Sequence, residues 1–252
     1  MEQFAPLSMQ EDYDNSGLQI GSPSANVESV LLCLSVTEDI IKEAARRGCN
    51  LIVSHHPLFF KGLKHITGAT AVERIAMEAL RANIGIYSAH TNLDNAYEGV
   101  SYEMAHALGM TDMTPLVPTF PGAETGTGII GEMSKPVPAL EFLRQLQTTF
   151  SVKALRYSTT TPKIVIRKVA LCGGSGAPFI KDAIAAGADA YVSGDIKYHD
   201  FDSYGPEILL ADVGHFESEI ASKKILARIL KNHFPTLPVF PAETECNPVG
   251  LL

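Results

Sequence analysis

Short apolar runs alternate with amphipathic segments along most of the chain, which is typical of an α/β protein. The first half predicts strands at 28–36, 50–56 and 84–90 and helices at 37–48, 69–83 and 99–109. Thr37 and Gly48 are suited to cap the first helix at its two ends. Because nearly continuous apolar strands between helices are typical of parallel sheets covered on both faces, we expect such a sheet here.

An aperiodic stretch rich in Pro and Thr, residues 110–125, is interpreted as the connection to a second half. Alternation then resumes, with helices expected at 137–150, 177–187 and 215–234 and strands at 168–174, 189–195, 206–214 and 237–243. The halves look like copies, since VLLCLSV…NLIVSHH matches VALCGGS…DAYVSGD, and IGIYSAHTNLD matches ILLADVGHFESE. The prediction is an α/β protein of two similar lobes, 1–125 and 126–252, that arose by internal duplication.

Composition narrows the class of protein. The chain has 252 residues, of which 46% are hydrophobic and 19% charged, as in a globular protein. Its formal net charge is −8 without a basic cluster, which argues against sequence-independent nucleic-acid binding but not against a small anionic substrate such as a nucleotide. No apolar run reaches the roughly 18 residues of a membrane helix, and the acidic start lacks the order of a signal peptide, so we expect a soluble, cytoplasmic protein.

The four cysteines are scattered singly and form no CxxC pair. Buried free thiols are therefore expected rather than a disulfide framework.

Polar residues that suit metal binding fall at four predicted strand ends: His55–His56, His90-x-x-x-Asp94, Asp195 with His199, and His215-x-x-x-Glu219. In open α/β sheets, the loops at the carboxyl ends of the strands converge on the ligand. These residues are therefore candidates for a ligand-binding site. If HFESE is helical, His215 and Glu219 share a face of that helix. His90 and Asp94 have the same separation, but TNLDN reads more as a turn.

Imidazoles and carboxylates without thiolates suit zinc, iron, manganese or nickel, and this chemistry does not choose among them. A single zinc ion needs about three protein ligands, whereas six candidates are present: His55, His56, His90, Asp94, His215 and Glu219. The surplus favours two ions roughly 3.5–4 Å apart, as in hydrolases that share a bridging water between two metals. Either Glu219 or Asp94 has the two oxygens needed to bridge them.

A purely structural role is an alternative for each of these candidate residues. A lone histidine near a strand end is usually structural, and His65, His106 and His233 lie outside the pattern and are taken as ordinary. Asp195 and His199 suit a structural cap or pair as well as a functional role. CGGSG at 172–176 lacks the lysine of a phosphate loop and favours a tight turn, and DNSGLQIG at 14–21 is by composition a turn or a short strand.

His55 and His56 pose a geometric problem, because neighbouring side chains of a regular strand point to opposite faces. Pro57 cannot donate a backbone hydrogen bond and restricts His56 to extended geometry, so the strand should end before the pair. Two metal ions would let each imidazole bind a different ion.

Six motifs in this order make the chain recognisable: DNSGLQIG, LIVSHHPLFF, YSAHTNLDNAYEGV, VALCGGSG, GADAYVSGDIKYHD and LLADVGHFESE. Over its whole length the chain resembles the Nif-three-like family, whose members are often labelled GTP cyclohydrolase I type 2 homologs. The resemblance implies two α/β lobes with a dinuclear metal site between them and hexameric rings built as trimers of dimers. It also implies two divalent ions with the ligands His55, His56, Asp94, His215 and Glu219, with Glu219 as the bridge and His90 as an occasional ligand or proton-transfer group.

Three features depart from the family pattern. The first helix of the family is nearly absent, Ser35 replaces an aspartate that commonly ends the first strand, and the short connection at 110–125 leaves no room for the domain inserted in longer relatives. If the aspartate supports the site in relatives, its support here is weaker or different.

Two classes of function follow from the resemblance. The leading hypothesis is a metal-dependent hydrolase of a small nucleotide-like substrate, in which His90 or His199 transfers protons. The alternative is a metal-binding regulatory or protein-interaction factor, because family members have been named as partners of transcription factors.

Overall fold

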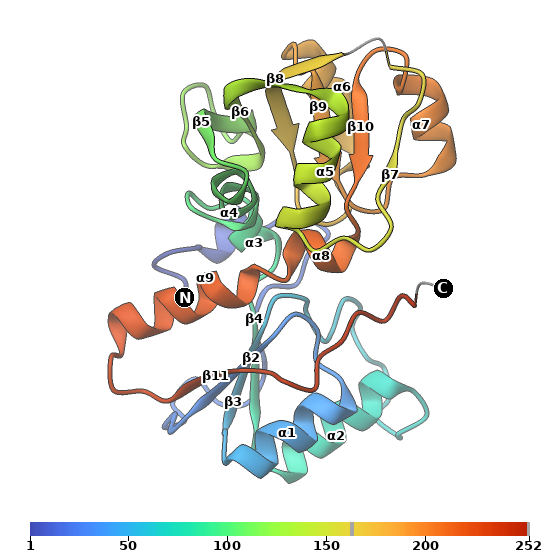
Figure 1. The fold of residues 1–252 in the computed structure, drawn as a ribbon. Helices are drawn as coiled ribbons and strands as arrows, with labels where there is room; N and C mark the ends of the chain where they lie inside the picture. Colours follow the sequence, from blue (N-terminus) through green and yellow to red (C-terminus); the bar gives the residue numbers. More distant parts are fainter. Residues whose placement is uncertain (162–163, 251–252) are drawn as a thin grey trace. The chain divides into compact units, whose positions relative to one another are not determined.

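A computed structural model describes residues 1–161 and 164–250 of the chain. The chain packs into two compact units, of which the first is Met1–Leu93 with Ser222–Pro248 and the second is built mainly from Asp94–Ala221 (Figure 1). The sequence predicted a division at residue 125, whereas in the structure the chain leaves the first unit at Leu93 and returns to it at Ser222.

The first unit contains a five-stranded mixed sheet with the order β1-β4-β3-β2-β11. Its parallel part consists of β2 (Val30–Cys33), β3 (Leu51–Ser54), β4 (Gly85–Ser88) and β11 (Val239–Pro241). The edge strand β1 (Gly17–Ile20) runs antiparallel to β4, so the DNSGLQIG motif includes a strand rather than a turn alone.

The helices of the first unit are α1 (Glu38–Arg47), α2 (Ala71–Arg81) and α9 (Ser222–His233), besides a 3₁₀ turn at Leu7–Met9. The predicted caps of α1 are confirmed, since Thr37 accepts a hydrogen bond from the Ile40 amide and Gly48 adopts a left-handed φ of 69°. The helices α1 and α2 lie together on one side of the sheet and α9 on the other (Figure 1).

The second unit contains a six-stranded mixed sheet with the order β5-β6-β8-β9-β10-β7. Its central strands β8 (Val165–Leu171), β9 (Ala190–Ser193) and β10 (Leu209–Asp212) are parallel. The remaining strands are antiparallel to their neighbours: β5 (Met110–Pro118), β6 (Gly126–Pro138) and β7 (Arg156–Tyr157).

Alternating strand residues divide the core of the second unit into two layers. Val169 and Val192 pack with Phe142 and Leu146 of α5 (Ala139–Thr149) and with residues of α4 (Val100–Ala107). The neighbouring strand residues Ala170 and Tyr191 pack instead with α6 (Ile180–Ala185), which follows a 3₁₀ turn at Ala177–Phe179. The short helices α3 (Thr91–Asp94), α7 (Tyr198–Tyr204) and α8 (His215–Glu219) complete the helices of the described chain.

The predicted duplication is visible in the strand order of each unit. The series β2-α1-β3-α2-β4 is followed by α3, and the series β8-α6-β9-α7-β10 is followed by α8. In both series the three strands are parallel and the second strand lies between the other two. The α/β fold with two similar lobes is therefore confirmed.

The parallel strands that the sequence predicted are present in both units, but each sheet is mixed because it also carries antiparallel strands. The stretch 110–125 is likewise more than a connection, since Met110–Pro118 forms β5 and pairs with β6. The register of this pair shifts between Thr111 and Thr114, which breaks the strict alternation of buried and exposed positions by which a strand is recognised.

The predicted helix at 215–234 is two helices, α8 and α9, separated at Ile220 and Ala221. The buried residues Ser218 and Glu219 belong to the second unit, whereas Ile225 and Leu226 are buried in the first. Neither Gly nor Pro marks the break between the two helices. The apolar periodicity alone therefore predicted one continuous helix.

Within the described residues, no helix has both the length and the apolar character that a membrane span requires. All four cysteines are free thiols, of which Cys33, Cys49 and Cys172 are buried and Cys246 is exposed. The expectation of buried free thiols is thus confirmed for three of them.

Candidate metal-binding residues

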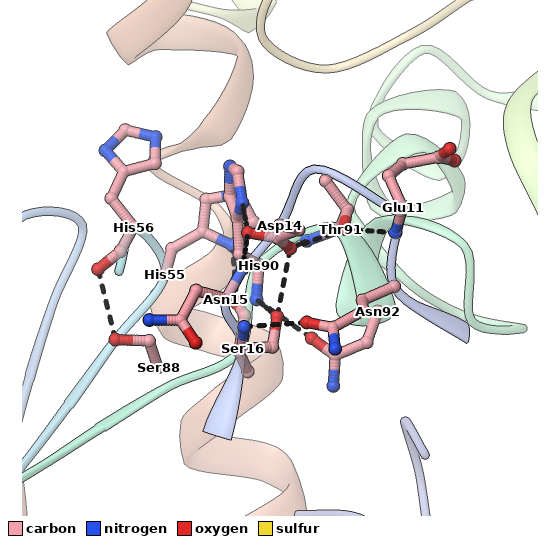
Figure 2. A network of polar contacts seen from close by, with 12 residues as sticks. Glu11, Asp14, Asn15, Ser16, His55, His56, Ser88, His90, Thr91 and Asn92 are labelled. Atoms are coloured by element: carbon pink, nitrogen blue, oxygen red, sulfur yellow. Dashed lines mark hydrogen bonds and ion pairs between the residues drawn. The ribbon is translucent and has the colours of Figure 1, made fainter. Parts of the chain in front are cut away.

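Three histidines cluster in the first unit at the carboxyl ends of adjacent parallel strands. His55 and His56 follow β3, and His90 follows β4 (Figure 2). Their ring centroids are 5.2 Å, 5.2 Å and 5.6 Å apart, and one potential ligand atom from each lies within 4.8 Å of the others. These residues, here called the histidine trio, are a group that could hold a metal ion.

Each imidazole of the trio has its Nδ1 atom beside an oxygen of the first unit. His55 Nδ1 lies 2.8 Å from the carbonyl oxygen of Ala89, His56 Nδ1 lies 2.7 Å from Ser35 Oγ, and His90 Nδ1 lies 2.8 Å from Asp14 Oδ1. A carbonyl or carboxylate oxygen only accepts, so the hydrogen of His55 and of His90 is on Nδ1. The lone pair is then on Nε2, the arrangement in which imidazole binds a metal while its other nitrogen is held by a partner.

The two adjacent histidines are accommodated because β3 ends at Ser54, as predicted from Pro57. The His55 and His56 amides still donate to the carbonyls of Cys33 and Leu34, so the backbone of the pair is fixed beside the end of β2. The Ser54 hydroxyl also donates to the His56 carbonyl at 2.8 Å. The rings of His55 and His56 can therefore face one another while the backbone of both residues stays hydrogen-bonded.

The segment before β1 supplies the partner of His90. The Asp14 carboxylate is fully buried and accepts hydrogen bonds from the Thr91 amide and hydroxyl and from Ser16 Oγ, in addition to His90 (Figure 2). Burial alone would raise the pKa of Asp14, but the hydrogen bonds from His90 and Thr91 outweigh it and hold this pKa well below its usual range. Asp14 is therefore an ionised anchor that fixes the His90 ring.

Sequence reasoning missed this role of Asp14, although DNSGLQIG was noted as a motif. The available signal was a run of small polar residues immediately before a strand that pairs with the strand preceding His90. Recognising it would have required the antiparallel β1–β4 pairing, which a turn-like composition does not predict.

The second unit places His215 and Glu219 one turn apart on α8, as the i, i+4 spacing predicted. His215 Nε2 lies 2.9 Å from Glu219 Oε2, and His215 Nδ1 lies 2.8 Å from Asp195 Oδ2. The hydrogen bond with Glu219, opposed by burial and reinforced by Asp195, raises the pKa of His215 to about 9. Asp195 therefore orients the His215 ring.

Glu219 is almost fully buried in the second unit, and CGGSG forms the predicted tight turn next to it. Gly174 has a φ of +62°, and a Cβ atom built on it would lie 2.0 Å from Glu219 Oε1. Its amide donates to Ser218 Oγ, and its carbonyl accepts from the Gly194 amide. The carboxylate of Glu219 thus lies against a backbone that only glycine can provide.

Asp94 ends α3 and belongs to the same electrostatic environment as Glu219. Burial, together with the charges of Asp94 and Glu219, raises the pKa of the Cys172 thiol well above its usual range. Its buried surroundings and these two carboxylates therefore keep Cys172 in the neutral thiol form.

The remaining histidines have ordinary surroundings. His199 is exposed on α7, with its ring edge-on to Tyr198 at 5.4 Å. His106 pairs with Glu98, His233 Nδ1 lies 3.0 Å from the Ile229 carbonyl, and His65 is exposed in a loop. Their surroundings match the ordinary roles assigned to His65, His106 and His233.

The donor set fits divalent transition-metal ions. The first unit presents three neighbouring imidazoles with anchored Nδ1 atoms, and the second presents a buried carboxylate paired with an oriented imidazole. Nitrogen and oxygen ligands of this kind bind zinc, iron, manganese and nickel, and the hydrogen-bond partners of the rings complete the arrangement typical of such ligands.

Comparison with known proteins places the chain in a family. The family model described as Duf34/NIF3 (NGG1p interacting factor 3) matches residues 1–248. A Clostridium perfringens protein named GTP cyclohydrolase 1 type 2 homolog is 36% identical over 222 residues, covering 87% of this chain and 84% of that protein. NIF3-like protein 1 of Drosophila melanogaster is 33% identical over 203 residues, covering 79% and 68%.

Among solved structures, the chain is similar to a hypothetical protein of Staphylococcus aureus. The TM-score is 0.91 at 25% identity, and the match covers 100% of this chain and 96% of the other. The family match over nearly the whole sequence, the similarity to these relatives and the shared fold lead to one conclusion: the chain is a member of the Duf34/NIF3 family.

Proposed function

We propose that the protein binds two divalent metal ions and is a metal-dependent hydrolase of a small nucleotide-like substrate. The observation that carries the proposal is the histidine trio, in which each Nδ1 atom lies beside an oxygen partner and one potential ligand atom from each ring lies within 4.8 Å of the others. His55 and His56 of this trio are proposed metal ligands, and the His90 ring lies beside both of them.

The proposed ligands are His55, His56, Asp94, His215 and Glu219, with zinc, iron, manganese or nickel as the metal. Ions held by these residues would supply Lewis acidity and would lower the pKa of bound water, which is the chemistry of two-metal hydrolases. Glu219, which is buried and contacts His215, would be one of the carboxylates that hold these ions, and the family resemblance implies that it bridges them.

His90 is the preferred proton-transfer group of the two predicted candidates. Asp14 holds its Nδ1 hydrogen, so Nε2 can take a proton from water or substrate while the buried carboxylate stabilises the resulting imidazolium. His199 stays a second candidate, but the contact that orients its ring is only with the neighbouring Tyr198.

The substrate class rests on the names of relatives and on charge. The Clostridium relative is named GTP cyclohydrolase 1 type 2 homolog, and a net charge of −8 argues against a nucleic-acid polymer but not against a small nucleotide. Assembly as a homohexameric ring, which the family resemblance implies, is part of the same proposal, and light scattering of the purified protein measures it.

A substrate screen tests the enzyme proposal. Metal-stripped protein is reloaded separately with zinc, manganese or iron and assayed on nucleoside mono-, di- and triphosphates and on simple phosphoesters. The proposal expects turnover that disappears with the metal while the chain stays folded and keeps its oligomeric state. No turnover across the screen, with assembly lost on stripping, would favour the regulatory alternative, in which the metals are structural.

A further inference from the structure

The end of the chain docks against the elements that carry His56, within the first unit. The Ala242 amide donates to the carbonyl of Leu32 in β2. The buried Glu43 carboxylate on α1 accepts hydrogen bonds from the amides of Glu243 and Thr244 and, at 2.6 Å, from the Thr244 hydroxyl. Residues 242–245, here called the C-terminal segment, are therefore held against β2 and the middle of α1.

Glu245 turns its side chain inward from the C-terminal segment. Its side chain is only 6% exposed, and Oε2 pairs with Lys223 Nζ of α9 at 2.6 Å. The other carboxylate oxygen, Oε1, accepts hydrogen bonds from the Leu34 amide at 2.5 Å and from the Ser35 amide at 3.1 Å. A buried carboxylate with these three donors fixes the backbone of the turn between β2 and α1.

The two residues held by Glu245 are the residues that hold His56. The Leu34 carbonyl accepts a hydrogen bond from the His56 amide at 2.8 Å, which fixes the backbone of that histidine. Ser35 Oγ lies 2.7 Å from His56 Nδ1, which fixes its ring. One turn of two residues thus connects Glu245 with both the main chain and the imidazole of His56.

We propose that Glu245 is a positioning residue for His56, acting through Leu34 and Ser35, so that docking of the C-terminal segment and metal binding by the histidine trio stabilise one another. The inference rests on the proposed metal binding and extends it to residues nearly 190 positions away in the sequence. It also explains how Ser35 supports His56: the short hydroxyl reaches the ring because a buried carboxylate holds its backbone in place.

Coupling of this kind is reciprocal. If the docked segment favours metal binding, bound metal must favour the docked segment by the same factor. Loss of a hydrogen-bond partner of a metal-binding histidine costs about 10- to 100-fold in metal affinity, and we expect an effect near the lower end because Glu245 acts one bond further away.

The test uses the full-length protein loaded with cobalt(II), whose visible absorption reports coordination. Cobalt affinity is measured by competition with a chelator for wild type, Glu245→Ala, Glu245→Gln, Ser35→Ala and the double variant Ser35→Ala/Glu245→Ala. Glu243→Ala is the matched control, because Glu243 lies in the same segment but its side chain is 74% exposed and pairs with Arg47. Thermal unfolding of the metal-free variants confirms that each is folded.

We expect Glu245→Ala to lower cobalt affinity about tenfold and to change the visible spectrum, Glu245→Gln to recover most of both because its oxygen still accepts from the amides, and Glu243→Ala to match wild type. The loss of cobalt affinity in the double variant should be little greater than that in the weaker-binding of the two single variants, since both changes break the same chain of contacts. Wild-type affinity and spectrum in Glu245→Ala, or fully additive losses, would overturn the inference. Absence of cobalt binding by wild type would instead overturn the proposed function.

Discussion

Substitution of Gly174 by Ala tests the position of Glu219 with a single methyl group. The new Cβ atom would lie 2.0 Å from Glu219 Oε1, far inside van der Waals contact. Gly174 cannot retreat, because its amide and its carbonyl are both hydrogen-bonded within the second unit. The carboxylate of Glu219 must therefore move and lose its 2.9 Å contact with His215.

The expected loss of unfolding free energy in Gly174→Ala has two contributions. A left-handed φ costs a non-glycine residue about 1–2 kcal/mol, and forcing a methyl group into a packed site adds about 1–3 kcal/mol. Gly187→Ala is the matched control, because Gly187 has a φ of +75° with no atom within 4 Å of the added Cβ. Gly187→Ala should therefore lose only the free energy that a left-handed φ costs an alanine.

Urea unfolding and metal analysis measure the two consequences. We expect Gly174→Ala to lose about 2–5 kcal/mol of unfolding free energy and to bind metal more weakly by over tenfold, while Gly187→Ala loses about 1–2 kcal/mol and keeps its metal. Equal stability and equal metal content in the two variants would refute the placement of Glu219 against the CGGSG turn.

Three further predictions address the anchor of His90, acid stability and the core. Asp14→Ala should lower metal-dependent turnover about 10- to 100-fold without unfolding the protein, since it removes the carboxylate that fixes the ring of His90, the proposed proton-transfer group. Turnover of the metal-loaded protein measures this, and unchanged turnover would contradict the anchoring role. Hydrogen bonds from the Thr67 amide and hydroxyl lower the pKa of Glu73 from 4.5 to about 2. The stabilisation is therefore complete above pH 4.5 and disappears as the pH falls toward 2, so the stability difference between wild type and Glu73→Gln in urea should shrink over that range; a constant difference would argue against it. Phe142→Ala should cost about 3–5 kcal/mol in the same assay, because this ring is fully buried in the second unit, and a loss below 1 kcal/mol would mean that the core is packed differently.

Much of the fold could be predicted, because each strand and helix of the repeats is determined mainly by residues close together in the sequence. Capping by Thr37 and Gly48 and the end of β3 before Pro57 depend on neighbouring residues and were predicted correctly. The strand at Met110–Pro118 and the break after Ile220 depend on pairing and packing with distant elements, so no local pattern signals them.

The candidate site divides in the same way. The His215–Glu219 contact follows from helical spacing, and the closeness of His55 and His90 follows from adjacent parallel strands. The residues that hold the rings could not be predicted, because Asp14 and Ser35 reach them from other segments. Hydrogen-bond partners of this type leave no fixed spacing in a sequence, and a structure is needed to find them.

The central claim is that His55, His56, Asp94, His215 and Glu219 bind metal, and metal content per chain tests it most directly. Wild type, His55→Ala, Glu219→Ala and the control His106→Ala are purified, incubated with manganese or zinc, desalted and analysed for metal. We expect two ions per chain in wild type and in His106→Ala, whose exposed histidine pairs with Glu98, and a large loss in each of the other two variants. Equal metal content in Glu219→Ala and His106→Ala would contradict the account.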